Sequence, residues 1–549
     1  MRLTTSHLRT AMARTRGPDV AYARCARGDG SAKWLRSLQR LIACGATVAK
    51  VHEVHSESGG RMRRMKTVAA GVVALCVAIS AFGVAGAAPE AVSAVVRTTV
   101  VGVPASDAEK LLATLSPAAP AEADEATVAA QAKVRGSLGL RSDTKWISQV
   151  LGDPASVGAV TASGGDFYGL TLASDEVSVV AQRNFLQNTM SSATGVNAAA
   201  MAAWQSFVET RLAIVDGKPR ATMFFDEVPG EIEDWLDKAL PTEARSLVSA
   251  EPIPAPRADL DALEAEMTQV TRSEQLQVSF AIHYEDGRVW AGSPDQASLD
   301  RLAKEFVGRP IDLELTGDGG PTGYDKNQVL PYGLMESGMK LVTAQSADQC
   351  TSGFSVNSGY GPMLLTAGHC FQLNWDVTAP GPGSWNAVGR VAARSYPNEA
   401  GSNWNFDAET VFAPTRPLWG RQHVNRDDWG HRINGWIGQN TDSLGDFYCH
   451  SGISSSGMDG YGGPRCGALL EKTFQPWWMN FANPVFRRID TDSVPGDSGG
   501  GVWWGTIYGD LAVALVQGRM TSRDGTNVDA ILSHLPYITN AWGLTVMTN

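Results

Sequence analysis

A serine surrounded by glycines near the C-terminus is the first feature suited to chemistry. Ser498 lies in the run PGDSGGG, in which four glycines bracket one acid and one serine. Glycine allows the positive φ angles and the close approach to a ligand that a tight turn needs. In such a turn the backbone amides of Gly496 and Ser498 converge on the place where an oxyanion develops. The alternative is a glycine-rich surface turn whose serine has no chemical role.

Two segments upstream supply the partners that a serine nucleophile requires. A serine hydroxyl reacts poorly unless a base takes its proton and a third group orients that base. His369 lies in the run MLLTAGHC, and Asp407 lies in NFDAETVF, whose alternation predicts a strand. The pattern G-x-S-x-G also fits the nucleophile turn of α/β-hydrolases, but their order along the chain is serine, acid, histidine. Here the order is histidine, aspartate, serine, and only His534 follows Ser498.

Other acids compete with Asp407 for the third position. Asp376 comes soon after the histidine, and the pair at 427–428 lies in a polar stretch typical of a solvated turn. Asp497 adjoins the serine, and we expect it to turn inward and pair with a cation. Asp407 is therefore the favoured acid.

The segments TAGHC and PGDSGG together resemble secreted bacterial serine proteases of the chymotrypsin fold, in the streptogrisin and α-lytic protease group. A third pair of segments agrees, because CHSG from Cys449 and GGPRCG up to Gly467 are similar to that group's C-x-S-G…C-G loop. The resemblance covers residues 330–549. The chain departs from the group's pattern at Gly501, where proline is usual, and in lacking the cysteine pair that flanks the serine block.

The resemblance implies a role for each residue of the site. His369 takes the proton of Ser498 and returns it to the leaving amine, while Asp407 fixes the imidazole tautomer and stabilises the imidazolium. The amides of Gly496 and Ser498 form the oxyanion hole. On this basis we expect a serine endopeptidase that acts on protein or peptide substrates without a cofactor or a metal. A serine esterase with the same triad and a secreted binding protein with a protease fold are the alternatives.

Substrate preference rests on fewer signals. Leu511–Val516 predicts a strand leading to Gln517 and Gly518, and the resemblance places these two in the wall of the primary pocket, where an extended substrate pairs with the backbone. Counted back from Ser498 without gaps, Asp492 falls where trypsin-like proteases place an aspartate for basic side chains. With the extra residues that the bacterial group often has before its serine block, Asp492 falls elsewhere, so both alignments stay open.

The region after Leu330 has the composition of an all-β fold. It holds eleven of the sixteen tryptophans, many short alternating stretches and turns of Gly, Asn, Asp and Ser, without a long amphipathic helical pattern. Its length suits two packed antiparallel β-barrels with the catalytic residues in the cleft between them. The chymotrypsin-like arrangement takes His369 and Asp407 from the first barrel and Ser498 from the second. We therefore expect a serine protease domain at 325–549.

The N-terminal part predicts export. Residues 61–87 contain the basic segment RMRRMK, an uncharged stretch rich in Ala, Val and Gly, and the ending AGA, which together form a signal peptide cut before Ala88. A secreted, extracellular protein that meets the membrane only during export follows from this. Residues 1–60 are then an upstream extension, untranslated if the true start is Met62 or Met65. The alternative is a membrane anchor with a basic cytoplasmic tail.

The positions of the cysteines agree with export. Three of the seven precede the predicted cut: Cys25, Cys44 and Cys76. The four that remain in the exported chain imply disulfides, and four cysteines allow three pairings. The resemblance implies the pairs Cys350–Cys370 and Cys449–Cys466. Zinc binding is disfavoured, because neither a C-x-x-C motif nor a paired-histidine spacing occurs.

Residues 88–324 carry no catalytic constellation and divide near 251–258, where three prolines interrupt the chain. A compact segment between a signal peptide and a protease domain predicts a pro-region, a role that the resemblance also implies. The alternatives are an independent binding module and a spacer. A net charge of −11 argues against nucleic acid as the main partner. We expect a monomer whose partners are its substrate and its own pro-region.

Two α+β units are expected in this pro-region. The first has a linker at 116–130, a strand pair at 167–180 and helices at 198–212 and 231–240. The second has a helix capped by Asp259, a hairpin turning at Asp286-Gly287, a helix through Leu299, Leu302 and Phe306, and a strand at 311–315. The hairpin unit offers a sheet edge or apolar surface on which the second barrel can assemble. The run that follows, 316–321, suits proteolytic cutting.

Overall fold

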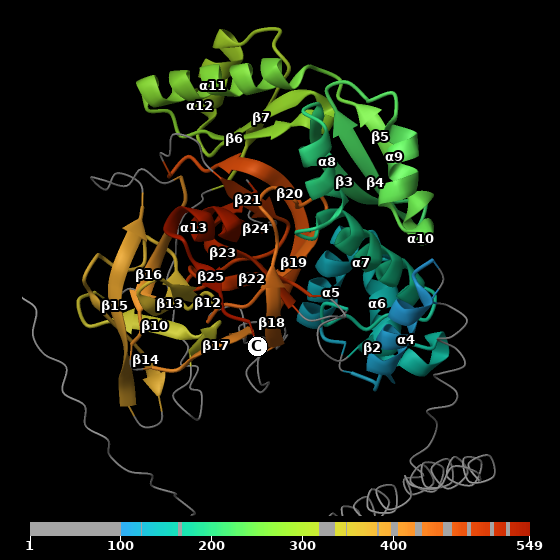
Figure 1. Cartoon of the computed structure of the whole chain (residues 1–549), viewed down its shortest axis with the longest axis horizontal. Coiled ribbons are helices and arrows are strands. Elements are labelled where there is room, and N and C mark those ends of the chain that lie inside the picture. The colour runs from blue at the N-terminus through green and yellow to red at the C-terminus, as the bar shows by residue number, and fades with distance from the viewer. Residues whose placement is uncertain are drawn as a thin grey trace, which may run out of the picture. The chain divides into compact units, whose positions relative to one another are not determined.

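The computed structural model describes most of the chain beyond residue 100 (Figure 1), and residues 88–549 belong to one compact unit. The described residues are 100, 102–121, 123–162, 167–317, 335–346, 349–381, 384–396, 405–414, 416–422, 431–453, 464–479, 485–505, 510–522 and 528–548. The predicted extension, the signal peptide, the stretch 318–321 and the turn at 427–428 lie outside them. Among the described helices, none is both long and apolar enough to cross a membrane.

Six strands close into a ring and form the second barrel. Its strands, in their order around the ring, are β19 (Phe447–His450), β20 (Arg465–Gln475), β21 (Phe486–Ile489), β24 (Val528–His534), β23 (Asp510–Thr521) and β22 (Gly501–Trp504). Each strand pairs antiparallel with the next, and β22 returns to β19. Val502, Val513 and Leu532 are fully buried in its interior.

Three further strands extend the sheet of the second barrel beyond β23. They are β18 (His431–Trp436), β17 (Leu418–Gln422) and β9 (Met335–Ser337).

An eight-stranded antiparallel sheet forms the first barrel. Its strands, in sheet order, are β11 (Gln349–Thr351), β10 (Lys340–Thr343), β14 (Asp376–Gly381), β15 (Ser384–Ser395), β16 (Ala408–Phe412), β13 (Gly361–Thr366), β12 (Ser355–Ser358) and β25 (Thr545–Val546). The chain between β11 and β12 forms hydrogen bonds with two parts of this sheet that are far apart in the strand order. Ser352 donates from its amide to the carbonyl of Met339, and Gly353 donates likewise to Leu365, each at 2.7 Å. These bonds join β10 to β13 and close the barrel.

The expected fold is confirmed, since an all-β region of two antiparallel barrels follows an α+β region. A helix that we did not expect, α13 (Leu535–Trp542), follows β24. Pro536 lies in its first turn, where a missing amide hydrogen costs nothing, and Gly543 ends it with a φ of 61°. Leu535 and Ile538 are fully buried in a cluster that contains residues of both barrels.

The first unit of the N-terminal region combines helices with a three-stranded sheet. Its helices are α4 (Ala105–Thr114), α5 (Glu125–Ser137), α6 (Thr144–Gly152), α7 (Val177–Ser191), α8 (Val196–Ala203), α9 (Ile232–Ala239) and α10 (Thr242–Arg245). Strands β3 (Phe207–Val215), β4 (Lys218–Phe225) and β5 (Val248–Pro252) form the sheet, and β1 (Leu115–Pro117) pairs with β2 (Val160–Ala162). The helix expected at 231–240 is present as α9.

Two expectations in this unit are wrong, because helices begin where a linker and a strand pair were expected. We expected a linker through residue 130, but α5 begins at Glu125 because the Asp124 side chain accepts the amide of Thr127 at 2.7 Å. We expected a strand pair at 167–180, but turns lead into α7 there. Tertiary burial of apolar residues at helical spacing decides α7, whose buried side chains include Val177, Val180, Ala181 and Leu186.

The helix expected at 198–212 is in fact two elements. The alanine-rich part forms α8 and ends at Ala203. From Phe207 the chain is strand β3, where β-branched residues alternate with polar ones and pair with β4.

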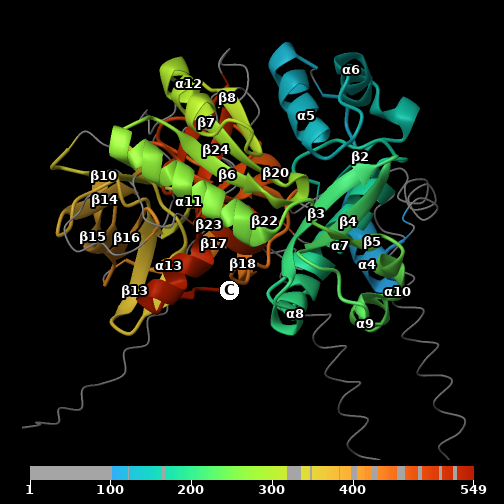
Figure 2. The same cartoon turned by 90° about the horizontal axis from the view of Figure 1, so that it is seen from above.

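The second unit follows the expected order of a helix, a hairpin, a helix and a strand. Its elements are α11 (Arg257–Glu274), β6 (Ser279–His283), β7 (Arg288–Ser293), α12 (Gln296–Glu305) and β8 (Ile311–Leu315). Gly287 makes the hairpin turn with a φ of 65°. The expected cap is wrong, because α11 starts before Asp259: Pro256, with its φ at −54°, precedes the first turn. Figure 2 shows α11 and α12 over the β6–β7–β8 sheet.

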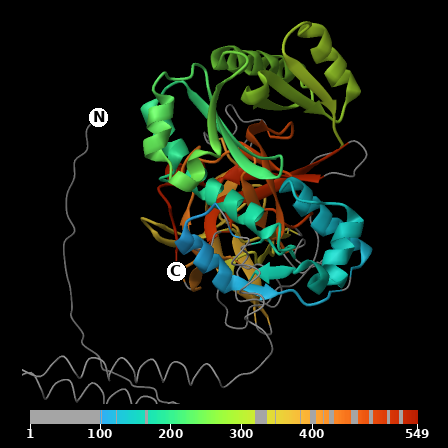
Figure 3. The same cartoon turned by 90° about the vertical axis from the view of Figure 1, so that its right-hand side faces the viewer.

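The hairpin of this unit extends the sheet of the second barrel. β6 pairs antiparallel with β20, with Phe280 opposite Gln475 and Ala281 opposite Phe474. Ala281 and Trp290 pack against Phe474 on the face away from α11 and α12. The first unit also packs on this barrel (Figure 3), where Phe167 and neighbouring residues share an apolar cluster with residues of β19 and β22.

Candidate active site

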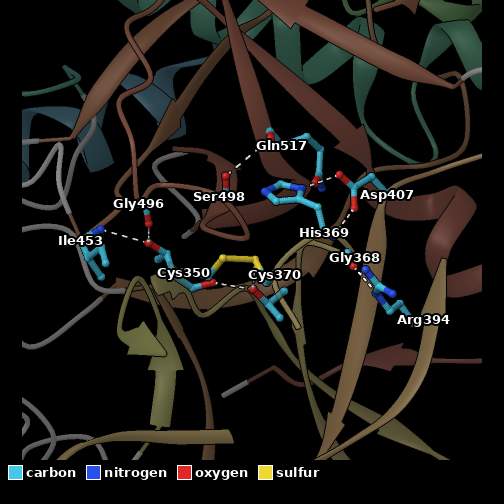
Figure 4. The surroundings of a disulfide bond; sticks show 12 residues. Cys350, Gly368, His369, Cys370, Arg394, Asp407, Ile453, Gly496, Ser498 and Gln517 are labelled. Carbon is cyan, nitrogen blue, oxygen red and sulfur yellow. Dashed lines mark hydrogen bonds and ion pairs between the residues drawn. A yellow bond between two sulfur atoms is a disulfide. The ribbon is translucent and has the colours of Figure 1, made fainter. Parts of the chain in front are cut away.

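His369 and Asp407 meet because β13 and β16 are adjacent antiparallel strands. Thr366, the last residue of β13, lies opposite Glu409, so the turn after β13 faces the residue before β16. Asp407 is fully buried, and its Oδ2 lies 2.7 Å from Nδ1 of His369 while its Oδ1 accepts the His369 amide at 2.9 Å (Figure 4). A Cβ at Gly368 would collide with the carbonyl of Ser395, so the turn requires glycine. The carboxylate therefore holds the imidazole with Nδ1 protonated and Nε2 available as a base.

A residue of the second barrel fixes the backbone of the acid. Ser533, in β24, accepts the amide of Asp407 at 3.1 Å and donates to its carbonyl at 2.9 Å. Sequence reasoning missed Ser533, because one serine within an apolar strand carries no local signal of its partner.

The glycine-rich turn takes the shape that its composition predicts. Gly496 and Gly499 have φ angles of 94° and 87°, a region that side chains disfavour. The carbonyl of Ser498 accepts the amide of Thr351 at 2.8 Å, and Gly499 donates to the carbonyl of Val516 at 2.7 Å. The turn is thus attached to β11 of the first barrel and to β23 of the second.

The Ser498 hydroxyl is nearly buried and lies beside β23. It donates to the main-chain carbonyl of Gln517 at 3.5 Å. The structure thus brings Gln517 next to the serine, and Gly518 follows it in β23 with Ile531 opposite. Figure 4 shows the Ser498 side chain on the same side of the site as His369.

The departure from the family pattern at Gly501 has a structural reason. The amide of Gly501 donates to Oγ of Ser337 at 3.2 Å, a bond that proline cannot make. A Cβ at this position would also collide with the Ser337 hydroxyl and crowd Gln422. The chain therefore places β9 where the ring of a proline would lie.

Asp492 differs from Gln517 and Gly518 in its contacts, which are ion pairs and a hydrogen bond away from Ser498. Its carboxylate pairs with Lys133 of α5 at 2.7 Å and with Arg465 of β20 at 3.0 Å. Its main-chain carbonyl accepts Nε2 of His450 at 2.9 Å, and burial lowers the pKa of that fully buried imidazole. The Asp492 charge is therefore already balanced by two cations.

Among the described residues, the other acids considered for the third position of the triad have partners other than His369. Asp376 pairs with Arg390 at 2.9 Å, and both side chains are exposed. Asp497 is fully buried and accepts the amide of Val494 at 3.1 Å, which closes the turn before the serine. A Cβ at Gly452 would collide with its carboxylate, so β19 continues into a segment packed beneath this turn.

Both disulfides implied by the resemblance are present, Cys350–Cys370 and Cys449–Cys466. The first ties the turn that carries His369 to β11. Its sulfurs and a ring nitrogen of His369 lie within 4.8 Å of one another, the one cluster of potential metal ligands found among the described residues. Because both sulfurs are in a disulfide, they are not thiolate ligands, and the cluster does not suit a metal ion.

No family model matches the chain, and no curated protein matches it. Among solved structures, the Nocardiopsis protease NAPase is 19% identical with a TM-score of 0.30, and it aligns over 39% of this chain and 100% of its own. Thermobifida fusca protease A is 20% identical with a TM-score of 0.30, and Cellulomonas bogoriensis chymotrypsin is 20% identical with a TM-score of 0.29. Both also align over 39% of this chain and 100% of their own.

Proposed function

We propose that the chain is a secreted serine endopeptidase made as a zymogen. The observation that carries the proposal is the contact of the buried Asp407 carboxylate with His369 at 2.7 Å, beside the glycine-rich turn that bears Ser498 (Figure 4). Histidine and aspartate come from the first barrel and serine from the second. His431 also pairs with a buried acid, Asp510, so the serine-bearing turn beside His369 is what distinguishes this pair.

Each residue has a defined task in peptide hydrolysis. Nε2 of His369 takes the proton of Ser498 as Oγ attacks the carbonyl carbon, and Asp407 stabilises the imidazolium. The amides of Gly496 and Ser498 donate to the oxyanion of the tetrahedral intermediate. The imidazolium then protonates the leaving amine, and an acyl-enzyme remains. Water, deprotonated by the same histidine, releases the acid and restores the serine.

The Ser498 hydroxyl must turn for this chemistry, since here it donates to the carbonyl of Gln517. Rotation about its Cα–Cβ bond exchanges that acceptor for His369. The backbone of Gln517 and Gly518 then pairs with an extended substrate, in the manner of strand addition. A preference for basic side chains at Asp492 is disfavoured, because Arg465 of the same domain already pairs with this carboxylate.

Residues 88–324 are the pro-region in this proposal. Pairing of β6 with β20 and the ion pair of Lys133 with Asp492 support a folding role at the second barrel. The last described residues of the pro-region lie against β23, the strand that carries Gln517. Thr316 bridges to Ser522, and Gly317 donates to the carbonyl of Thr521 at 2.7 Å. These contacts lie at the end of the strand β23, which also carries Gln517, and they support a blocking role before cleavage.

Secreted protein carrying Ser498→Ala tests the activity. The native chain should hydrolyse peptide amides and react at Ser498 with a fluorophosphonate probe. In the variant, turnover should fall by a factor of about 10⁶ and the probe should no longer label the protein. N-terminal sequencing of the secreted form should find a new terminus within 316–334. Hydrolysis of simple esters without peptide amides would favour the esterase alternative. A native chain that neither cleaves nor takes the label would favour a binding protein.

A further inference from the structure

Thr351 joins the two halves of the candidate site. It is the last residue of β11 and is fully buried. Its neighbour Cys350 is bonded to Cys370, the residue after His369. Figure 4 shows this disulfide, which links the histidine turn covalently to the residue before Thr351.

The polar groups of Thr351 all have partners at the glycine-rich turn or beside it. Its amide donates to the carbonyl of Ser498 at 2.8 Å, and its hydroxyl donates to the carbonyl of Gly496 at 2.6 Å. The same hydroxyl accepts the amide of Ile453 at 3.1 Å, and its carbonyl accepts the hydroxyl of Thr366 at 2.8 Å. One buried residue thus binds the carbonyls on both sides of Asp497.

These two carbonyls restrain the backbone that carries the amides of the proposed oxyanion hole. They belong to the peptides on either side of the one that carries the Ser498 amide, so holding both limits how that peptide can turn. Gly496, with a φ of 94°, has no Cβ to restrict its backbone, so outside contacts decide its conformation. The segment has no room to shift toward β11, because even a Cβ at Gly499 would collide with the carbonyl of Thr351.

We propose that the hydroxyl of Thr351 is a positioning group for the oxyanion hole, an inference that rests on the proposed function. It touches neither substrate nor the reacting atoms, and it acts by holding Gly496 and Ser498 in the donor geometry. Oxyanion stabilisation is stronger in the transition state than in the ground state. Loss of the hydroxyl should therefore lower kcat and leave KM nearly unchanged.

The test compares Thr351→Val, which keeps the shape and removes the hydroxyl, with Thr351→Ser, which keeps the hydroxyl. In the full chain, processed to its active form, Thr351→Val should lower kcat for a peptide amide by about 10- to 100-fold, less than the loss of a direct donor. KM should stay within about threefold. Affinity for a peptide boronate should fall in parallel with kcat, because the boronate imitates the tetrahedral state. Thr351→Ser should restore kcat to within about threefold of the native value.

Thr410→Val is the matched control. Thr410 is also buried in the first barrel, and its hydroxyl accepts the amide of Ala393 at 3.1 Å. This variant should lose stability to a similar degree and keep its kcat and its affinity for the boronate. If Thr351→Val does not fold, Thr351→Ala carries the same comparison with less crowding.

Three results would overturn the inference in an active native enzyme. The first is that folded Thr351→Val keeps its kcat and its affinity for the boronate within twofold of the native values. The second is that Thr410→Val loses as much kcat and boronate affinity as Thr351→Val does. The third is Thr351→Ser as impaired as Thr351→Val. A native chain without hydrolysis or labelling at Ser498 would instead overturn the proposed function, so the two failures are distinct.

Discussion

Ser533 binds both the amide and the carbonyl of Asp407, at 3.1 and 2.9 Å, although the two residues belong to different barrels. The acid that orients His369 is therefore held by hydrogen bonds from the second barrel. Because Ser498 also belongs to that barrel, the same structural unit positions both ends of the proposed triad.

Ser533→Ala should weaken both stability and turnover. The amide of Asp407 would be left buried without its partner, a loss of about 1–3 kcal/mol in the free energy of unfolding. Displacement of the acid should also lower kcat, by about tenfold if His369 moves with it. Urea unfolding and steady-state kinetics measure the two effects. Unchanged values for both would show that the contact between the barrels does not support the acid.

Asp407→Asn should fold but lose about 10⁴ in turnover, because an amide no longer favours the tautomer with Nδ1 protonated. The measurement is kcat for a peptide amide, with circular dichroism as the check on folding. Asp376→Asn is the matched control, since that exposed carboxylate pairs with Arg390. Equal losses in the two variants, or none in Asp407→Asn, would assign the third position to another acid.

Asp446 should make stability depend on pH. Burial raises the pKa of this carboxyl to about 7, with Asp442 opposing its ionisation and Arg183 favouring it. The pKa of Asp446 is higher in the folded than in the unfolded state. Its contribution to the free energy of unfolding is therefore complete below the ordinary pKa of about 4 and is lost as the pH rises through 7. Asp446→Asn cannot ionise and should gain stability relative to the native chain between pH 4 and pH 8. Urea unfolding across that range measures the difference, and a constant difference would contradict the assignment.

The pro-region should speed folding of the protease domain. Non-local strand pairing dominates both barrels and is slow to form, because long loops must close first. Denatured residues 325–549 should regain activity faster when residues 88–324 are supplied as a separate chain. Equal recovery without the added chain would make the segment an accessory module. Inhibition of the mature enzyme by residues 88–324 should also occur, and its absence would remove the blocking role.

Local patterns determined a large part of this protein. The glycines of the serine turn could be anticipated because positive φ is a property of single residues. The hairpin from β6 to β7 follows from alternation around Gly287, and α9 from apolar residues on one helical face. The pairing of Cys350 with Cys370 came from a resemblance, since spacing alone left three choices open.

Tertiary structure alone decided the contacts that hold the site together. Thr351 lies 145 residues from Gly496, and Asp407 lies 126 residues from Ser533. Neither threonine nor serine within a strand indicates a partner so far away, because strand register and barrel closure decide which residues meet. The same holds for α7 and β3, which we expected as strand and helix, because burial against neighbouring elements selects the other form. The backbone conformation of a single residue depends on its own type and its neighbours in sequence. Hydrogen bonds between the two barrels form only when the long loops that separate their residues close.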